Sequence, residues 1–208
     1  MKNKFLKISM GLLIAFGAIN VSNINANAET KKAPVATKKA EKNAPFVFDK
    51  TKEYKVLIET TMGKIKLKTY TKESPKSVEN FVTLISRKYY DGIIFHRVIK
   101  DFMIQTGDPT GTGRGGSSAW NKEFENENSP KLAYNKEGIV GMANHGRDTN
   151  GSQFFITTGA RPHLNGGYTI FAEVIEGMDV VKAIENVKTS AGDRPEKEVK
   201  MLKVTLVK

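Results

Sequence analysis

Four polar side chains stand out in the 208-residue chain because each lies in a stretch of large apolar residues. They are Arg97, Gln105, Asn144 and Gln153. Guanidinium and amide groups do not titrate near neutral pH, so they supply no general base, but they donate and accept hydrogen bonds. Beside an apolar hollow, such groups are suited to holding an extended peptide. Arg97 is the strongest candidate for a functional role, because an arginine is rarely buried unless it is paired or functional.

These side chains belong to three segments of the chain. The segments read FHRVIKDFMIQTGD at 95–108, GIVGMANH at 138–145 with NGSQFFI at 150–156, and HLNGGYTIF at 163–171. Together they closely resemble the cyclophilin family of peptidyl-prolyl cis–trans isomerases, over roughly Tyr54 to Lys208. The resemblance implies an enzyme that accelerates rotation about X–Pro bonds in polypeptide substrates and uses no cofactor.

The resemblance also implies a role for each matching residue. Arg97 is expected to be the catalytic arginine. The wall of a proline pocket is expected to consist of Phe102, Met103, Phe155 and Leu164, and the peptide backbone is expected to bind Gln105, Ala143, Asn144 and Gln153. The expected substrate-binding set is completed by Gly113, His145, His163 and Tyr168.

Two of these positions depart from the best-known eukaryotic members of the family. His163 stands where they carry Trp, and Tyr168 stands where they carry His. The tyrosine keeps an aromatic wall, whereas His163 removes an indole N–H donor and much contact area. We therefore expect the family's cyclic-peptide inhibitor, a cyclosporin-like molecule, to bind only weakly.

Hydrophobic periodicity predicts the elements that position these residues. Alternation on either side of Thr61-Met62-Gly63 predicts a β-hairpin, and apolar residues at helical spacing predict a helix over 75–88 with Ser74 as its N-cap. Further strands are predicted at 93–99, 102–105, 139–143, 153–157, 170–175 and 199–207, with a second helix over 178–186.

Many short strands joined by Gly-rich connections favour an antiparallel barrel or sandwich with helices over its open ends. The resemblance narrows this to a mainly β fold, a closed eight-stranded antiparallel β-barrel capped by two α-helices. Because side chains fill the interior of so small a barrel, a ligand is expected to bind on its outer face.

The first 45 residues differ in composition from the rest. Residues 1–28 combine early lysines, a short apolar core and the sequence Ala26-Asn27-Ala28, which predicts a secretory signal peptide. The alternative, a membrane anchor, would need roughly 20 apolar residues, and this core is shorter. Residues 29–45 are rich in Lys and Ala and predict a flexible basic linker, so the cyclophilin-like domain is expected at 46–208. We expect a bacterial form that is secreted or lies at the cell surface.

Composition and charge exclude several classes of site and partner. The absence of Cys excludes disulfides and thiolate metal sites. The three histidines, His96, His145 and His163, are too far apart in sequence for local ligand spacing, so no metal site is predicted. More than half of the net charge of +11 lies before residue 46, so no nucleic-acid groove is predicted. We expect a monomer whose basic linker contacts anionic cell-wall polymers loosely.

Two further motifs have plain interpretations. The Gly-rich stretch 111–116 lacks the Gly-Lys-Ser/Thr ending of a phosphate loop, so we expect it to rim the groove. The alternating Glu123, Glu125 and Glu127 predict a solvated face rather than an acid pair or a calcium site. A second functional hypothesis remains open, a non-catalytic peptide-binding or chaperone module at the cell surface in which isomerisation is incidental.

Overall fold

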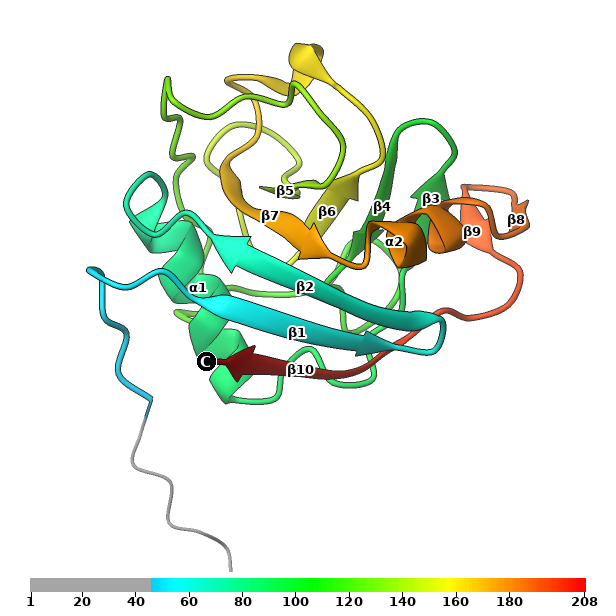
Figure 1. Cartoon of the computed structure of the whole chain (residues 1–208), viewed down its shortest axis with the longest axis horizontal. Coiled ribbons are helices and arrows are strands. Elements are labelled where there is room, and N and C mark those ends of the chain that lie inside the picture. The colour runs from blue at the N-terminus through cyan, green and yellow to red at the C-terminus, as the bar shows by residue number, and fades with distance from the viewer. Residues whose placement is uncertain (1–45) are drawn as a thin grey trace, which may run out of the picture. The chain divides into compact units, whose positions relative to one another are not determined.

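A computed structural model describes residues 46–208 of the chain (Figure 1). The predicted signal peptide and basic linker therefore lie outside the described residues. Eight strands form one antiparallel sheet in the order β10-β1-β2-β7-β5-β6-β4-β3. Along the sheet these strands are β10 (Met201–Val207), β1 (Lys55–Thr60), β2 (Gly63–Thr69), β7 (Ile170–Glu176), β5 (Ile139–Met142), β6 (Phe154–Thr157), β4 (Met103–Thr106) and β3 (Arg97–Ile99).

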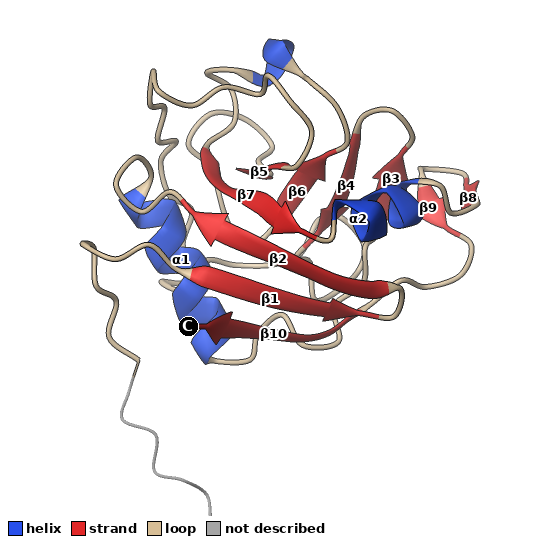
Figure 2. Ribbon diagram, viewed as in Figure 1, coloured by secondary structure: helices blue, strands red, loops and turns tan. Residues whose placement is uncertain are grey.

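The remaining elements are short and lie between these strands. They are the helices α1 (Pro75–Ser86) and α2 (Met178–Glu185), the 3₁₀ turn η1 (Pro162–Leu164), and the small hairpin of β8 (Thr189–Ser190) and β9 (Arg194–Pro195). Figure 2 shows the two helices at opposite ends of the curled sheet. Helix α1 contacts β7 and β10, whereas α2 contacts β2, β3 and β4. The prediction of a mainly β fold with two helices is confirmed.

The prediction of a closed barrel is wrong, because the sheet is a curled half-barrel that stays open between β3 and β10. Those two edge strands form no ladder with each other. The segment before β3 meets the chain around the start of β10 through one isolated bridge, Ile94 to Lys200, and through backbone hydrogen bonds such as Phe95 N–H to the Val199 carbonyl at 2.9 Å. The strand predicted at 93–99 begins only at Arg97, and it ends at a turn in which Asp101 has φ +57°. The free edge of β3 meets a turn and not β10, because the N–H of Val98 donates to the carbonyl of Asp193 at 2.8 Å.

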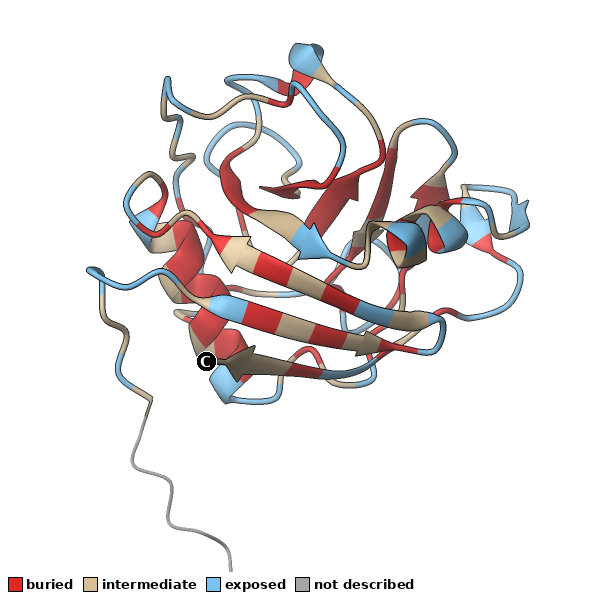
Figure 3. Ribbon diagram, in the orientation of Figure 1, coloured by how far each residue is buried: buried red, intermediate tan, exposed pale blue. Residues whose placement is uncertain are grey.

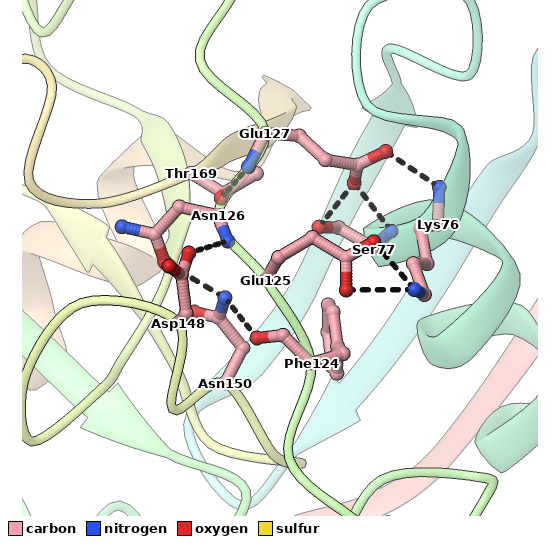
Figure 4. Close-up of polar contacts among 9 residues, drawn as sticks. All are labelled: Lys76, Ser77, Phe124, Glu125, Asn126, Glu127, Asp148, Asn150 and Thr169. Carbon is pink, nitrogen blue, oxygen red and sulfur yellow. Dashed lines mark hydrogen bonds and ion pairs between the residues drawn. The ribbon is translucent and has the colours of Figure 1, made fainter.

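Helix α1 begins at Pro75, as the sequence predicts, but its cap comes from elsewhere in the chain. Ser74 occupies the N-cap position, yet its hydroxyl donates to the carbonyl of Ile170 at 2.6 Å and not to the helix. Glu127 caps the helix instead, accepting the backbone N–H of Lys76 at 2.9 Å and of Ser77 at 2.7 Å (Figure 4). The expectation that Glu127 belongs to a solvated face is therefore wrong.

The two faces of the sheet carry separate apolar clusters. Alternate residues of β1 and β2 are buried, as the banding of these strands in Figure 3 shows, and they join the core beneath α1. Phe81 of α1 lies at the centre of that core, with ring centroids 5.1–5.3 Å from those of Tyr90, Phe154 and Phe171. A second cluster, which contains Phe155, packs on the opposite face of the sheet.

Within residues 46–208 no helix is long and apolar enough to cross a lipid bilayer. The same part of the chain contains no group of three or more His, Asp or Glu side chains arranged to hold a metal ion.

Candidate active site

Arg97 opens β3 and points away from the core. The alternation along β3 buries Val98 and leaves the Arg97 side chain 45% exposed. Arg97 lies opposite Gln105 on β4, and Gln105 lies opposite Phe155 on β6. Directly opposed side chains on antiparallel strands are close neighbours on one face. The register therefore sets an arginine, a glutamine and a phenylalanine side by side on the outer face of the sheet.

The apolar part of this face is a packed cluster that we call the apolar wall. Its buried members are Met103, Tyr134, Ile139, Phe155, Leu164 and Ile170, and the partly exposed side chains against it include Phe102, Ala143 and Tyr168. The Tyr134 ring stacks on the Phe155 ring at 5.8 Å, and the Tyr168 ring meets Phe155 edge-on at 5.7 Å. The wall is thus held by the same packing that holds the sheet.

The exposed edge of the apolar wall carries one more predicted residue. His163 stacks on Phe102 with ring centroids 6.0 Å apart, and its own side chain is exposed on η1. Arg161 lies over the same Phe102 ring at 5.8 Å. His163 and Arg161 therefore both border the Phe102 ring, and His163 is the position at which the sequence departs from the best-known family members.

A pair of glutamine amides joins the apolar wall to a neighbouring cavity. Gln105 Nε2 donates to Gln153 Oε1 at 2.9 Å, and Gln153 Nε2 donates to the carbonyls of Gly113 at 3.1 Å and Gly115 at 2.9 Å. Because both glutamines are held by neighbours, their amides are oriented before any peptide binds. Such fixed donors and acceptors suit recognition of a peptide backbone.

Asp108 holds the Gly-rich loop that these amides meet. Its buried carboxylate accepts backbone N–H groups from Thr110 at 2.8 Å, Thr112 at 3.0 Å, Gly113 at 2.6 Å and Gly115 at 3.1 Å. Burial acts to raise the pKa of Asp108, but the hydrogen bonds from Thr110, Gly115 and Gly113 outweigh burial and lower the pKa to about 2. An ionised carboxylate thus shapes the loop at neutral pH.

The cavity beside the glutamines has a volume of about 500 Å³. Its lining includes the predicted residues Gln105, Gly113, Ala143, Asn144, His145 and Gln153. His145 lies exposed at its edge, with Nε2 3.2 Å from Oε1 of Glu123. Asn144 donates through Nδ2 to the carbonyl of Gly167 at 3.0 Å. The cavity is therefore lined mainly by polar groups, whereas the neighbouring wall is apolar.

A strut of three residues, 125–127, ties together the segments that carry these groups (Figure 4). Asn126 donates through Nδ2 to the Gly167 carbonyl at 2.9 Å and accepts from Asn150 Nδ2 at 2.8 Å. The Gly167 carbonyl therefore receives two amide donors, Asn126 and Asn144. The strut links the start of α1, the loop of Asn144 and the loop between Leu164 and Tyr168.

The structure places the thirteen predicted site residues in two groups, the cavity and the apolar wall, and on the strand beside them. Six line the cavity. The apolar wall or its edge contains Ala143, which also lines the cavity, together with Phe102, Met103, Phe155, His163, Leu164 and Tyr168. Arg97 joins both groups through its register with Gln105. The roles assigned to these residues stay predictions, although their proximity is what those roles require.

Sequence reasoning missed three residues that shape this face. Asp193 pairs with Arg97, Nε to Oδ2 at 3.3 Å, and Tyr134 lies beneath Phe155. Asp108 ends the segment 95–108 that carries the family resemblance, so the motif itself points to it. Asp193 and Tyr134 lie in stretches with no apolar pattern or motif, and only the fold connects them to the site.

The chain matches the family described as cyclophilin type peptidyl-prolyl cis-trans isomerase/CLD over residues 55–206. This chain belongs to the cyclophilin family. It is 52% identical over 151 residues to peptidyl-prolyl cis-trans isomerase CYP18-1 of Arabidopsis thaliana, a match that covers 73% of this chain and 94% of that relative. Peptidyl-prolyl cis-trans isomerase-like 1 of Neurospora crassa is also 52% identical, over 74% of this chain and 94% of its own length.

Other matches extend this cyclophilin relationship. The chain is 53% identical to CYP71 of Arabidopsis thaliana but spans only 24% of that longer relative. A crystal structure of a Cryptosporidium parvum cyclophilin has a TM-score of 0.74 and 39% identity, covering 76% of this chain and 99% of that one. A structure of the same Cryptosporidium parvum protein in the presence of the dipeptide Ala-Pro has a TM-score of 0.72.

The activity follows from family membership. This cyclophilin is a peptidyl-prolyl cis–trans isomerase, an enzyme of the isomerase class, and cyclophilins bind proline-containing peptides. The relatives named above are eukaryotic, so they do not bear on the predicted bacterial or secreted form.

Proposed function

We propose that Arg97 catalyses X–Pro rotation by donating a hydrogen bond to the prolyl nitrogen as the amide twists. Rotation must break C–N resonance, which sets a barrier of about 18–20 kcal/mol. In the twisted state the nitrogen lone pair is no longer delocalised, so the nitrogen becomes a better hydrogen-bond acceptor. A donor aimed at it binds the transition state more tightly than either ground state, which is the condition for catalysis.

The observation that carries this proposal is the position of Arg97. Its guanidinium stands half exposed next to Gln105, on the strand beside the apolar wall. A guanidinium is always charged and offers a planar set of donors, so it needs no proton transfer to act. One preorganised donor of this kind lowers a barrier by roughly 2.7–4 kcal/mol in oxyanion holes.

The rest of the face holds the two ends of the rotating bond. In this proposal the proline ring rests on the apolar wall, against Phe102, Met103, Phe155 and Leu164. The backbone on the other side of the bond is held by Gln105, Ala143, Asn144 and Gln153. When both sides of the amide are held, the bound peptide can move mainly by rotation about the X–Pro bond.

The test is the variant Arg97→Ala, with Arg147→Ala as the matched control. Arg147 is an exposed arginine near the cavity that pairs only with its neighbour Asp148 among the described residues. Arg97→Ala is expected to lower kcat/KM by about 10²–10³ in proline-limited refolding, with the fold intact. Binding of an X–Pro peptide is expected to persist.

The same variant separates catalysis from the alternative of a peptide-binding or chaperone module. If the protein acts by binding alone, Arg97→Ala keeps its biological effect while turnover is lost. If it acts as an isomerase, the two fall together. A strain that carries the Arg97→Ala chain distinguishes these outcomes directly.

We also propose that the natural substrates are exported polypeptides. The support is the signal-peptide pattern of residues 1–28 and the basic composition of residues 29–45. Cell fractionation tests the predicted secreted or cell-surface location. Deleting residues 31–45 tests the contact with cell-wall polymers, since it should release the protein from the wall without changing turnover.

Inhibitor binding tests whether His163 weakens the binding of a cyclic-peptide inhibitor. We propose that a cyclosporin-like cyclic peptide binds this chain weakly, because an imidazole offers less contact area than an indole. His163→Trp is expected to tighten that binding by about tenfold. Nanomolar inhibition of the unaltered chain would contradict the proposal.

A further inference from the structure

Arg97 has a carboxylate partner that lies 96 residues further along the chain. Nε of Arg97 donates to Oδ2 of Asp193 at 3.3 Å. Among residues 46–208 it has no other hydrogen-bond or ion-pair partner. The two terminal nitrogens of the guanidinium, Nη1 and Nη2, therefore remain open to a bound peptide. The contact occupies the one nitrogen nearest the side-chain stem.

The backbone places Asp193 for this contact. Asp193 sits in the turn between β8 and β9, and its carbonyl accepts the N–H of Val98, the residue after Arg97, at 2.8 Å. It adopts φ +61°, a left-handed conformation that Asp, Asn and Gly tolerate better than other residues. The turn is thus fastened to β3 beside the arginine whose side chain it meets.

We propose that Asp193 is a positioning residue that holds the Arg97 guanidinium in the orientation needed for catalysis. The proposal rests on the role of Arg97 given above. A free arginine side chain samples many rotamers, and a carboxylate on Nε removes rotations that would carry Nη1 and Nη2 away from the amide. Nη1 and Nη2 are then already oriented toward the peptide-binding face before a peptide binds.

The pair contributes little to folding, so its effect should appear in turnover. Both side chains are 45% exposed, and ion pairs at such positions add little to stability. The contact of Asp193 with Arg97 is therefore better explained by orientation of the arginine than by stabilisation of the fold.

The experiment compares three substitutions of Asp193 in the full chain. Asp193→Gly keeps the left-handed backbone and removes the acceptor, and Asp193→Asn keeps both the backbone preference and an oxygen that accepts from Nε. Asp193→Ala removes the acceptor and also strains the turn. Glu196→Ala is the matched control, because Glu196 forms an exposed ion pair with Lys188 in the same hairpin.

The expected results are measured as kcat and KM by NMR exchange on an X–Pro peptide. Asp193→Gly is expected to lower kcat by about five- to tenfold with KM nearly unchanged. Asp193→Asn is expected to keep more than half of the wild-type kcat, and Glu196→Ala to match the wild type. In an Arg97→Ala background, Asp193→Gly is expected to have no further effect, because its partner is already absent.

Three results would overturn the inference. They are a loss below threefold for Asp193→Gly, an equal loss for Asp193→Asn, or the same loss in the Arg97→Ala background. The last outcome would mean that Asp193 supports the fold and not the arginine. Full activity of Arg97→Ala by itself would instead reject the proposed role of Arg97, so the two failures are distinct.

Discussion

The two parts of the active site are built in different ways. The apolar wall shares its packing with the sheet, and Met103, Phe155 and Leu164 are at most 7% exposed. The polar part consists of Arg97, Gln105 and loop residues. They are oriented by hydrogen bonds that are accepted by Asp193, by Asp108 and by carbonyls of the Gly-rich loop. Folding itself creates the wall, whereas the polar part needs separate contacts to hold each donor.

This difference predicts separable effects of substitution. Changes in the wall should lower both stability and turnover, because one set of contacts serves both. Changes at exposed members of the polar part should lower turnover alone. Buried members of the polar part, such as Asp108, should fall between these limits.

The largest loss of stability is expected from Phe155→Ala. Phe155 packs between Tyr134 and Tyr168, and removing a buried phenylalanine ring costs about 3–5 kcal/mol. Urea unfolding should show that loss together with a fall in kcat/KM. A loss below about 1 kcal/mol would show that the wall is not part of the packed structure.

The next effect is expected from Asp108→Ala. The substitution removes the acceptor of four backbone N–H groups in the loop, and we expect a loss of about 2–3 kcal/mol in the free energy of unfolding. KM should rise more than kcat falls, because Gln153 loses its fixed partners on Gly113 and Gly115. An unchanged KM would separate the loop from peptide binding.

A smaller effect is expected from Gly141→Ala on β5. A Cβ at this position would run into the hydroxyl of Tyr134 and the ring of Phe155. Overpacking of this kind costs about 1–3 kcal/mol and should displace the Phe155 ring. The control is Gly167→Ala, where the backbone has no positive φ and the new Cβ would meet only the carbonyl of Leu164, at an ordinary contact distance of 3.7 Å. Equal stability of Gly141→Ala and the wild type would contradict the close packing of Tyr134 and Phe155 against Gly141.

The smallest effect concerns pH and His96, which is 6% exposed. Burial, together with the nearby Arg194 and Arg97, lowers the pKa of His96, while Asp108 acts in the opposite direction. The unfolded chain therefore binds a proton at His96 more readily than the folded chain does. The contribution of neutral His96 to the free energy of unfolding is fully present above about pH 6.5, and it is lost as the pH falls below that value.

Thermal unfolding at several pH values tests this prediction. His96→Gln should flatten the decline on the acid side, and His145→Gln, which alters an exposed histidine, is the matched control. Over the same range Asp108 should stay ionised, because its pKa is about 2. A decline of the same slope in His96→Gln would assign the acid sensitivity to other groups.

Much of the fold was predictable because its signals are local. Val78, Phe81, Val82 and Ile85 recur at helical spacing, and they are the buried face of α1. The helix ends at Ser86, two residues earlier than predicted, because Lys88 takes φ +57°. Most strands likewise appear within one or two residues of the apolar runs that predict them.

The features that escaped prediction depend on partners far apart in the chain. Glu127 caps α1 across 51 residues, and Asp193 meets Arg97 across 96. Neither carboxylate lies in a sequence pattern that indicates which residue it contacts. The opening of the sheet is similar, because Val98 of β3 donates to the carbonyl of Asp193 and not to β10. An apolar run at 93–99 shows neither where the strand begins nor what its free edge meets.

The most direct test of the account is the rate of cis–trans exchange of one X–Pro peptide, measured by NMR with wild type, Arg97→Ala and Arg97→Lys. Unfolding in urea is measured on the same samples. We expect exchange catalysed by Arg97→Ala to be slower by about 10²–10³, and Arg97→Lys to recover little of it, because an ammonium lacks the planar fork. Stability should be unchanged in both. An Arg97→Ala enzyme within threefold of the wild type would contradict the central claim that this guanidinium stabilises the twisted amide.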